Sequence, residues 1–125
     1  MLSTILLAVG SAVPVLWGVA HIIPTKAVVA GFGPLSADNR RILTMEWVAE
    51  GLTLVFLGVL TGLMLLLAPA GGASLLVYRS AAAMLVVMAA WTAFTGARTP
   101  ILPMKLCPFV KGAAALCLLF GSLVR

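Results

Sequence analysis

The chain has 125 residues, of which 63% are hydrophobic and 9% are charged. Soluble domains carry about 25% charged residues, so this composition excludes a soluble enzyme and a soluble DNA-binding domain. The formal charge of +5 therefore bears on orientation in a membrane, and no nucleic acid is expected as a partner.

Four long apolar segments follow one another along the chain, at residues 2–23, 42–67, 74–95 and 103–124. Each is long enough for a membrane-spanning helix, which needs about 20 residues. The first segment lacks the positive n-region and the cleavage pattern of a signal peptide, so we expect it to be retained. We predict one all-α domain over residues 1–125, an integral membrane four-helix bundle with antiparallel up-down topology.

The first connection is the longest, and Pro24 stops the helix before it. Residues 27–32 are apolar enough to lie in the membrane interface. Ser36 is expected to cap the second helix, with Asp38 in the first turn, where the helix dipole favours a negative charge.

The basic residues are divided unequally between the two sides of the predicted bundle. Arg79 and Arg125 belong to one side, and Arg79, beside Tyr78, is expected to anchor the third helix there. Because cytoplasmic loops are enriched in Lys and Arg, we expect the first and third connections to face the cytoplasm and both termini to face the external side. The residues assigned to these two connections are Lys26, Arg40, Arg41, Arg98, Lys105 and Lys111.

Ionisable side chains gather toward the same side. His21 closes the first segment, while Glu46 and Glu50 lie one turn apart on the second and share a helix face. Glu50 lies about 6 Å deeper along the axis, where a carboxylate faces the protein interior, pairs with a cation or carries a proton. We therefore select Glu50, His21 and Glu46 as candidate acid–base residues. The alternative is a structural contact of Glu50, with partners among His21, Arg98 and Lys105.

Aromatic and hydroxyl side chains at this side form the candidate ligand-binding site. Three tryptophans could line a flat lipophilic pocket, and the alternative is a belt of interfacial anchors. Two threonines end the third segment, and an arginine follows them. The complete set is Trp17, Trp47, Trp91, Thr92, Thr95 and Arg98.

The two cysteines do not predict a disulfide. Cys107 and Cys117 lie on one predicted helix, about 15 Å apart along its axis, which is beyond disulfide reach. A metal site would have to use His21, two glutamates and Cys107, whose spacing matches no known motif. We therefore expect no metal site, and the sequence identifies no cofactor.

Small residues recur every four positions in two of the segments. Gly10, Pro14 and Gly18 do so in the first, and Gly58 and Gly62 do so in the second. In lipid such spacing lets helix backbones approach closely. These positions predict helix contacts, either inside the bundle or between subunits.

Three stretches resemble the DoxX-like family of small membrane proteins. Residues 50–58 match its pattern of an acid and a glycine, an apolar run and a second glycine, and residues 78–84 are similar to its third helix, an arginine followed by alanines. Gly18, His21 and Pro24 resemble its Gly-polar-Pro ending of the first helix. The resemblance implies a four-helix bundle and a role like that of subunits of quinone-linked oxidoreductases, redox-stress complexes or assembly factors. His21 departs from the lysine that the family often has there.

The sequence favours a small accessory or binding protein of the cell membrane, of the bacterial inner-membrane type. It would hold a lipophilic ligand, quinone-like or lipid, or a partner subunit near the cytoplasmic leaflet, with membrane lipid and a membrane complex or homo-oligomer as partners. The alternative is a compact membrane enzyme, an isomerase or a hydrolase, in which Glu50 and His21 act on a lipophilic substrate. A third interpretation, a proton-coupled small exporter, is disfavoured because the first helix has no acid.

Overall fold

The computed structural model describes residues 1–68 and 71–125 of the chain. The described residues are all-helical and contain no strand. The elements are α1 (Leu2–Ile22), α2 (Thr25–Gly31), α3 (Ala37–Leu67), α4 (Gly72–Phe94), the 3-10 helix η1 (Gly96–Arg98) and α5 (Leu102–Leu123).

Within this part of the chain, four helices (α1, α3, α4 and α5) are each long and apolar enough to cross a membrane, as in a multi-pass membrane protein. Helix α1 has 21 residues and is about 30 Å long, which is close to the thickness of the hydrocarbon core of a bilayer. Helix α3 has 31 residues and is longer by about 15 Å. When α1 spans the core, the first turns of α3 therefore extend beyond it.

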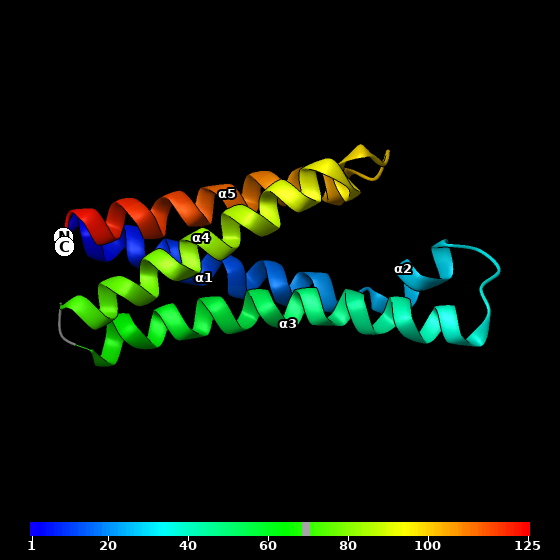
Figure 1. The fold of residues 1–125 in the computed structure, drawn as a ribbon, viewed down its shortest axis with the longest axis horizontal. Helices are drawn as coiled ribbons and strands as arrows, with labels where there is room; N and C mark the ends of the chain where they lie inside the picture. Colours follow the sequence, from blue (N-terminus) through cyan, green and yellow to red (C-terminus); the bar gives the residue numbers. More distant parts are fainter. Residues whose placement is uncertain (69–70) are drawn as a thin grey trace.

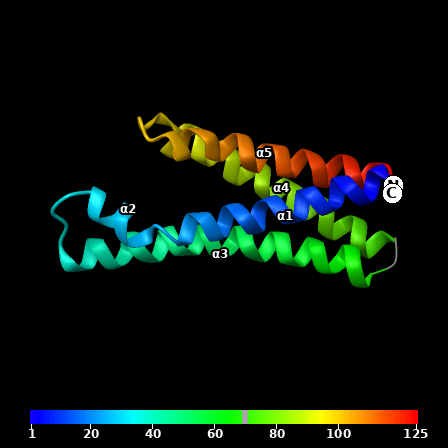
Figure 2. The same cartoon turned by 180° about the vertical axis from the view of Figure 1, so that it is seen from behind.

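The four long helices run side by side (Figure 1). Both chain termini lie at one end, together with the last turn of α3 and the first turn of α4, and we call this the termini end. The opposite end carries α2 and η1, and we call it the loop end. Figure 2 shows the same arrangement from behind, with α1 between α3 and α5. Helix α4 packs mainly against α5 and makes few contacts with α3.

Helices α1 and α3 approach closely at glycines. A side-chain carbon added to Gly18 would lie 2.6 Å from the carbonyl oxygen of Gly51, and one added to Gly58 would overlap the backbone of Ser11. Gly10 instead faces Leu118 of α5, where an added carbon would lie 2.9 Å from the leucine side chain. The small residues predicted to mark helix contacts thus lie at contacts inside the bundle.

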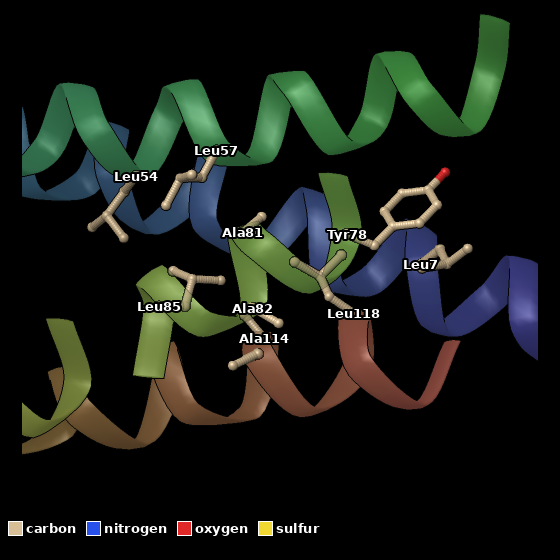
Figure 3. Packing of buried hydrophobic residues seen from close by; sticks show 10 residues of the cluster. Leu7, Leu54, Leu57, Tyr78, Ala81, Ala82, Leu85, Ala114 and Leu118 are labelled. Carbon is tan, nitrogen blue, oxygen red and sulfur yellow. The ribbon is translucent and has the colours of Figure 1, made fainter. Parts of the chain in front are cut away.

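A small apolar core fills the centre of the bundle. Figure 3 shows side chains from all four long helices meeting there, among them Leu7, Leu54, Leu85 and Leu118. Each of these four leucines is at most 1% exposed. Most other large apolar side chains point outward. This is expected for helices surrounded by lipid, because lipid tails are as apolar as the protein core.

The loop end contains more helix than the apolar segments predict. Residues 25–31 form α2, and α3 begins at Ala37, five residues before the expected start at residue 42. Ser36 caps α3 as predicted, because its Oγ accepts a hydrogen bond of 3.1 Å from the Asn39 backbone N–H. Gly33 has φ +77°, a backbone conformation that glycine adopts without steric cost, and it lets the chain turn between α2 and α3.

The termini end is joined by polar contacts between helices. Arg125 donates a hydrogen bond of 2.6 Å to the hydroxyl of Tyr78, and Ser3 donates one of 2.9 Å to the carbonyl of Gly121. Tyr78 is fully buried, whereas its neighbour Arg79, the expected interfacial anchor, is exposed. The Tyr78 ring packs in the core, and its hydroxyl points toward the termini end (Figure 3).

Candidate functional site

Each of the four long helices contributes one polar side chain to a single cluster, which we call the polar cluster. Its members are His21 of α1, Glu50 of α3, Thr92 of α4 and Lys111 of α5. His21, Thr92 and Lys111 are buried, and the Glu50 side chain is 33% exposed. The cluster joins all four helices in the half of the bundle nearest the loop end.

Lys111 is the centre of the polar cluster. Its ammonium donates hydrogen bonds to Glu50 Oε1, with which it forms an ion pair, and to Thr92 Oγ1 at 2.8 Å. The Lys111 side chain is 1% exposed. Helical side chains point toward the N-terminus of their own helix, which for α5 is the loop end. This direction carries the ammonium from the middle of α5 toward Glu50 and Thr92.

His21 lies on the other side of the Glu50 carboxylate. Its Nε2 is 3.7 Å from Glu50 Oε2 and has no hydrogen-bond partner among the described residues. The imidazole stacks on the indole of Trp47, with ring centroids 3.9 Å apart and 12° between the planes. Trp47 also donates a hydrogen bond of 2.8 Å to the His21 carbonyl. Trp47 thus holds both the ring and the backbone of His21 in place.

A polar contact between α1 and α5 lies one helical turn from the polar cluster. Trp17, four residues before His21, donates a hydrogen bond of 3.3 Å to the thiol sulfur of Cys107, four residues before Lys111. Residues four apart share a helix face, so this contact lies on the same faces of α1 and α5 as His21 and Lys111. Cys107 and Cys117 are both free thiols.

The structure corrects the assignment of Lys111 to a connection. Lys111 lies well inside α5, nine residues after its first residue, and is buried. Five basic residues therefore remain near the loop end.

Sequence analysis missed Lys111 as a site residue, although two signals were present. A lysine this far into an apolar helix needs a counter-charge, and Glu50 is the one acid in the chain placed at comparable depth.

The remaining candidate residues do not join the polar cluster. Glu46 is exposed at the loop end, and Trp91 is 73% exposed on the outer face of α4. Thr95 and Arg98 are also exposed, and the Thr95 hydroxyl donates a hydrogen bond of 2.7 Å to the carbonyl of its own helix at Trp91. The three tryptophans therefore face different surroundings rather than one common pocket.

The interior next to the polar cluster is closely packed. The gap bounded by Trp17, Leu54 and Lys111 is too small to hold a water molecule. In the part of the chain that the structure describes, no three His, Cys, Asp or Glu side chains are grouped so as to hold a metal ion. The polar cluster therefore offers ion pairing and hydrogen bonding between helices, and the gap beside Lys111 has no room for a substrate.

An open groove does lie on the outer surface, between α4 and α5, and we call it the α4–α5 groove. Its volume is about 610 Å³. Small residues such as Ala90, Ala93 and Gly112 form its lining, Phe109 borders it, and Lys105 is its one charged lining residue. Phe109 is 76% exposed. The groove is thus an apolar surface with a cation toward the loop end.

The polar cluster and the groove share the same two helices. Thr92 and Lys111 point into the bundle, while their chain neighbours Ala93 and Gly112 line the groove. The hydrogen bond between Lys111 and Thr92 therefore fixes the spacing of α4 and α5 directly beneath the groove. A hydrogen bond of 3.5 Å from Arg79 to Ser122 links the same helices near the termini end.

Comparison of the chain with protein-family models, with curated proteins and with solved structures finds no match. The resemblance to DoxX-like proteins therefore stays a prediction from residues 50–58, 78–84 and the end of α1.

Proposed function

We propose that this chain is a small membrane accessory protein that holds a lipophilic molecule in the α4–α5 groove. The observation that carries this proposal is the groove itself, with a volume of about 610 Å³, within the range of about 300–1,000 Å³ found for ligand sites. Its lining is apolar apart from Lys105. A molecule with a long apolar part and a polar end matches this distribution.

The polar cluster supports a structural role better than the alternative of an enzyme. The Glu50 carboxylate is engaged by Lys111, and His21 is buried beneath Trp47. A substrate needs space within hydrogen-bond reach of an acid or a base. The gap beside Lys111 does not admit a water molecule, and Glu50, whose side chain is 33% exposed, already pairs with Lys111. An accessory role is also what the resemblance to DoxX-like proteins implies.

The loop end is proposed to face the cytoplasm of a cell membrane of the bacterial inner-membrane type. Lys26, Arg40, Arg41, Arg98 and Lys105 lie toward this end, and Arg79 and Arg125 lie toward the other. Short cytoplasmic loops are enriched in such residues.

Cysteine labelling of intact cells tests the orientation. An impermeant thiol reagent should reach Thr4→Cys from outside and should reach Lys26→Cys only after the membrane is opened. The unaltered chain, with its two native cysteines, is the background control. Labelling of Lys26→Cys from outside alone would mean that the orientation is inverted.

Filling the groove tests the function. A side-chain carbon added at Gly112 meets no heavy atom within 4 Å, so Gly112→Leu should occupy the groove without disturbing the bundle. The expected result is a loss of most of the lipophile that the protein retains from a lipid extract, measured by native mass spectrometry in a mild detergent. Ala113→Leu adds the same bulk at an exposed position outside the groove and should retain it. Equal retention by both variants would contradict the proposal.

A further inference from the structure

The α4–α5 groove has one charged residue and an apolar path that leads away from it. Lys105 lies in the first turns of α5, and Phe109, one turn further into the helix, borders the groove. The ammonium of Lys105 makes no ion pair and no side-chain hydrogen bond with the described residues. A positive charge without a partner among the described residues thus precedes a groove whose other lining residues are apolar.

The charge of the loop end matches an anionic ligand. Five basic residues lie there, against the acids Asp38 and Glu46, and Asp38 is 3.3 Å from Arg41 in an ion pair. The third acid, Glu50, is paired with Lys111 inside the bundle. The chain itself therefore supplies few carboxylates for Lys105, whereas anionic lipids attract basic residues at the membrane surface.

We infer that the α4–α5 groove is a site for an anionic phospholipid, whose phosphate contacts Lys105 and whose acyl chain lies along Phe109 and Gly112. This inference rests on the proposed function and names the ligand class. A neutral lipophile such as a quinone would fill the groove but leave Lys105 without a counter-charge. A helix from a second copy of the chain would bring an apolar face to Lys105 and has only Asp38 and Glu46 to offer as surface acids.

Competition between two phospholipids tests the inference. The full chain in a mild detergent is offered phosphatidylglycerol and phosphatidylcholine with identical acyl chains, and native mass spectrometry measures the ratio of the two bound lipids. We expect a preference of about fivefold for phosphatidylglycerol, since one basic residue near an anionic surface contributes about 1 kcal/mol. Lys105→Gln should reduce the ratio to about 1 and still bind phosphatidylcholine.

Arg40→Gln is the matched control, because it removes one positive charge from the loop end on α3, away from the groove. It should keep the preference. A preference that survives Lys105→Gln, or that falls equally in both variants, would overturn the inference while leaving lipophile binding intact. Retention of neither lipid by the unaltered chain would contradict the proposed function as well. A dimer that excludes both lipids would assign the groove to a second copy and overturn the inference.

Discussion

At the scale of single residues, the polar cluster places an ion pair, Lys111 with Glu50, in the mainly apolar interior of the bundle. Separating two such charges from water costs several kcal/mol each, and that cost is offset only when the pair has good geometry and further hydrogen bonds. Lys111 has both, because Glu50 and Thr92 both accept from its ammonium. The cluster therefore stabilises the bundle most when both charges are present.

Removing one charge of the pair should destabilise the bundle more than removing both. Lys111→Met leaves the Glu50 carboxylate without its cation and should cost about 3 kcal/mol. The double variant Lys111→Met with Glu50→Gln leaves no unpaired charge and should unfold at a higher temperature than Lys111→Met alone. Thermal unfolding in detergent gives the unfolding temperatures of the single and the double variant.

Glu46→Gln is the control for this comparison, because Glu46 is exposed at the loop end. It should leave the unfolding temperature nearly unchanged. Lys111→Met and Glu50→Gln should each lower the unfolding temperature by some amount. If these two decreases simply add in the double variant, the two side chains do not act as a pair.

At the scale of helices, sequence analysis located the four spans and placed three members of the polar cluster at the correct end. The length of each apolar run is enough to locate a spanning helix. A segment that crosses lipid must form its backbone hydrogen bonds internally, as a helix does. The start of α3 was placed five residues late, at residue 42, because its first turns carry charged residues and lie outside the apolar run. The cap signal at Ser36 was the better guide to that boundary.

The pairing of Glu50 with Lys111 was beyond sequence analysis for a physical reason. Helices in lipid are apolar on both the lipid face and the core face, so their sequences say little about rotation around the axis. Whether Lys111 or Lys105 faces Glu50 depends on that rotation. The α4–α5 groove was missed for the same reason, because its alanines and Gly112 become a lining only when the two helices are placed together.

At the scale of the whole molecule, the contacts that hold the bundle together and the proposed lipid site lie on opposite sides of the same helices. The inner faces of α4 and α5 carry Thr92 and Lys111, which fix the bundle, and the outer faces form the groove. A substitution on one side should therefore leave the property of the other side largely intact. This separation is the central claim of the account.

Glu50→Gln and Gly112→Leu, compared in one preparation, test that claim most directly. The measurement is the amount of phosphatidylglycerol that each folded variant retains in native mass spectrometry, beside its unfolding temperature. We predict that Glu50→Gln unfolds at a lower temperature but retains the lipid, because the contact between Lys111 and Thr92 persists. Gly112→Leu should unfold near the temperature of the unaltered chain and lose most of the lipid. Loss of lipid from folded Glu50→Gln, with retention by Gly112→Leu, would contradict the account and identify the polar cluster as the binding site.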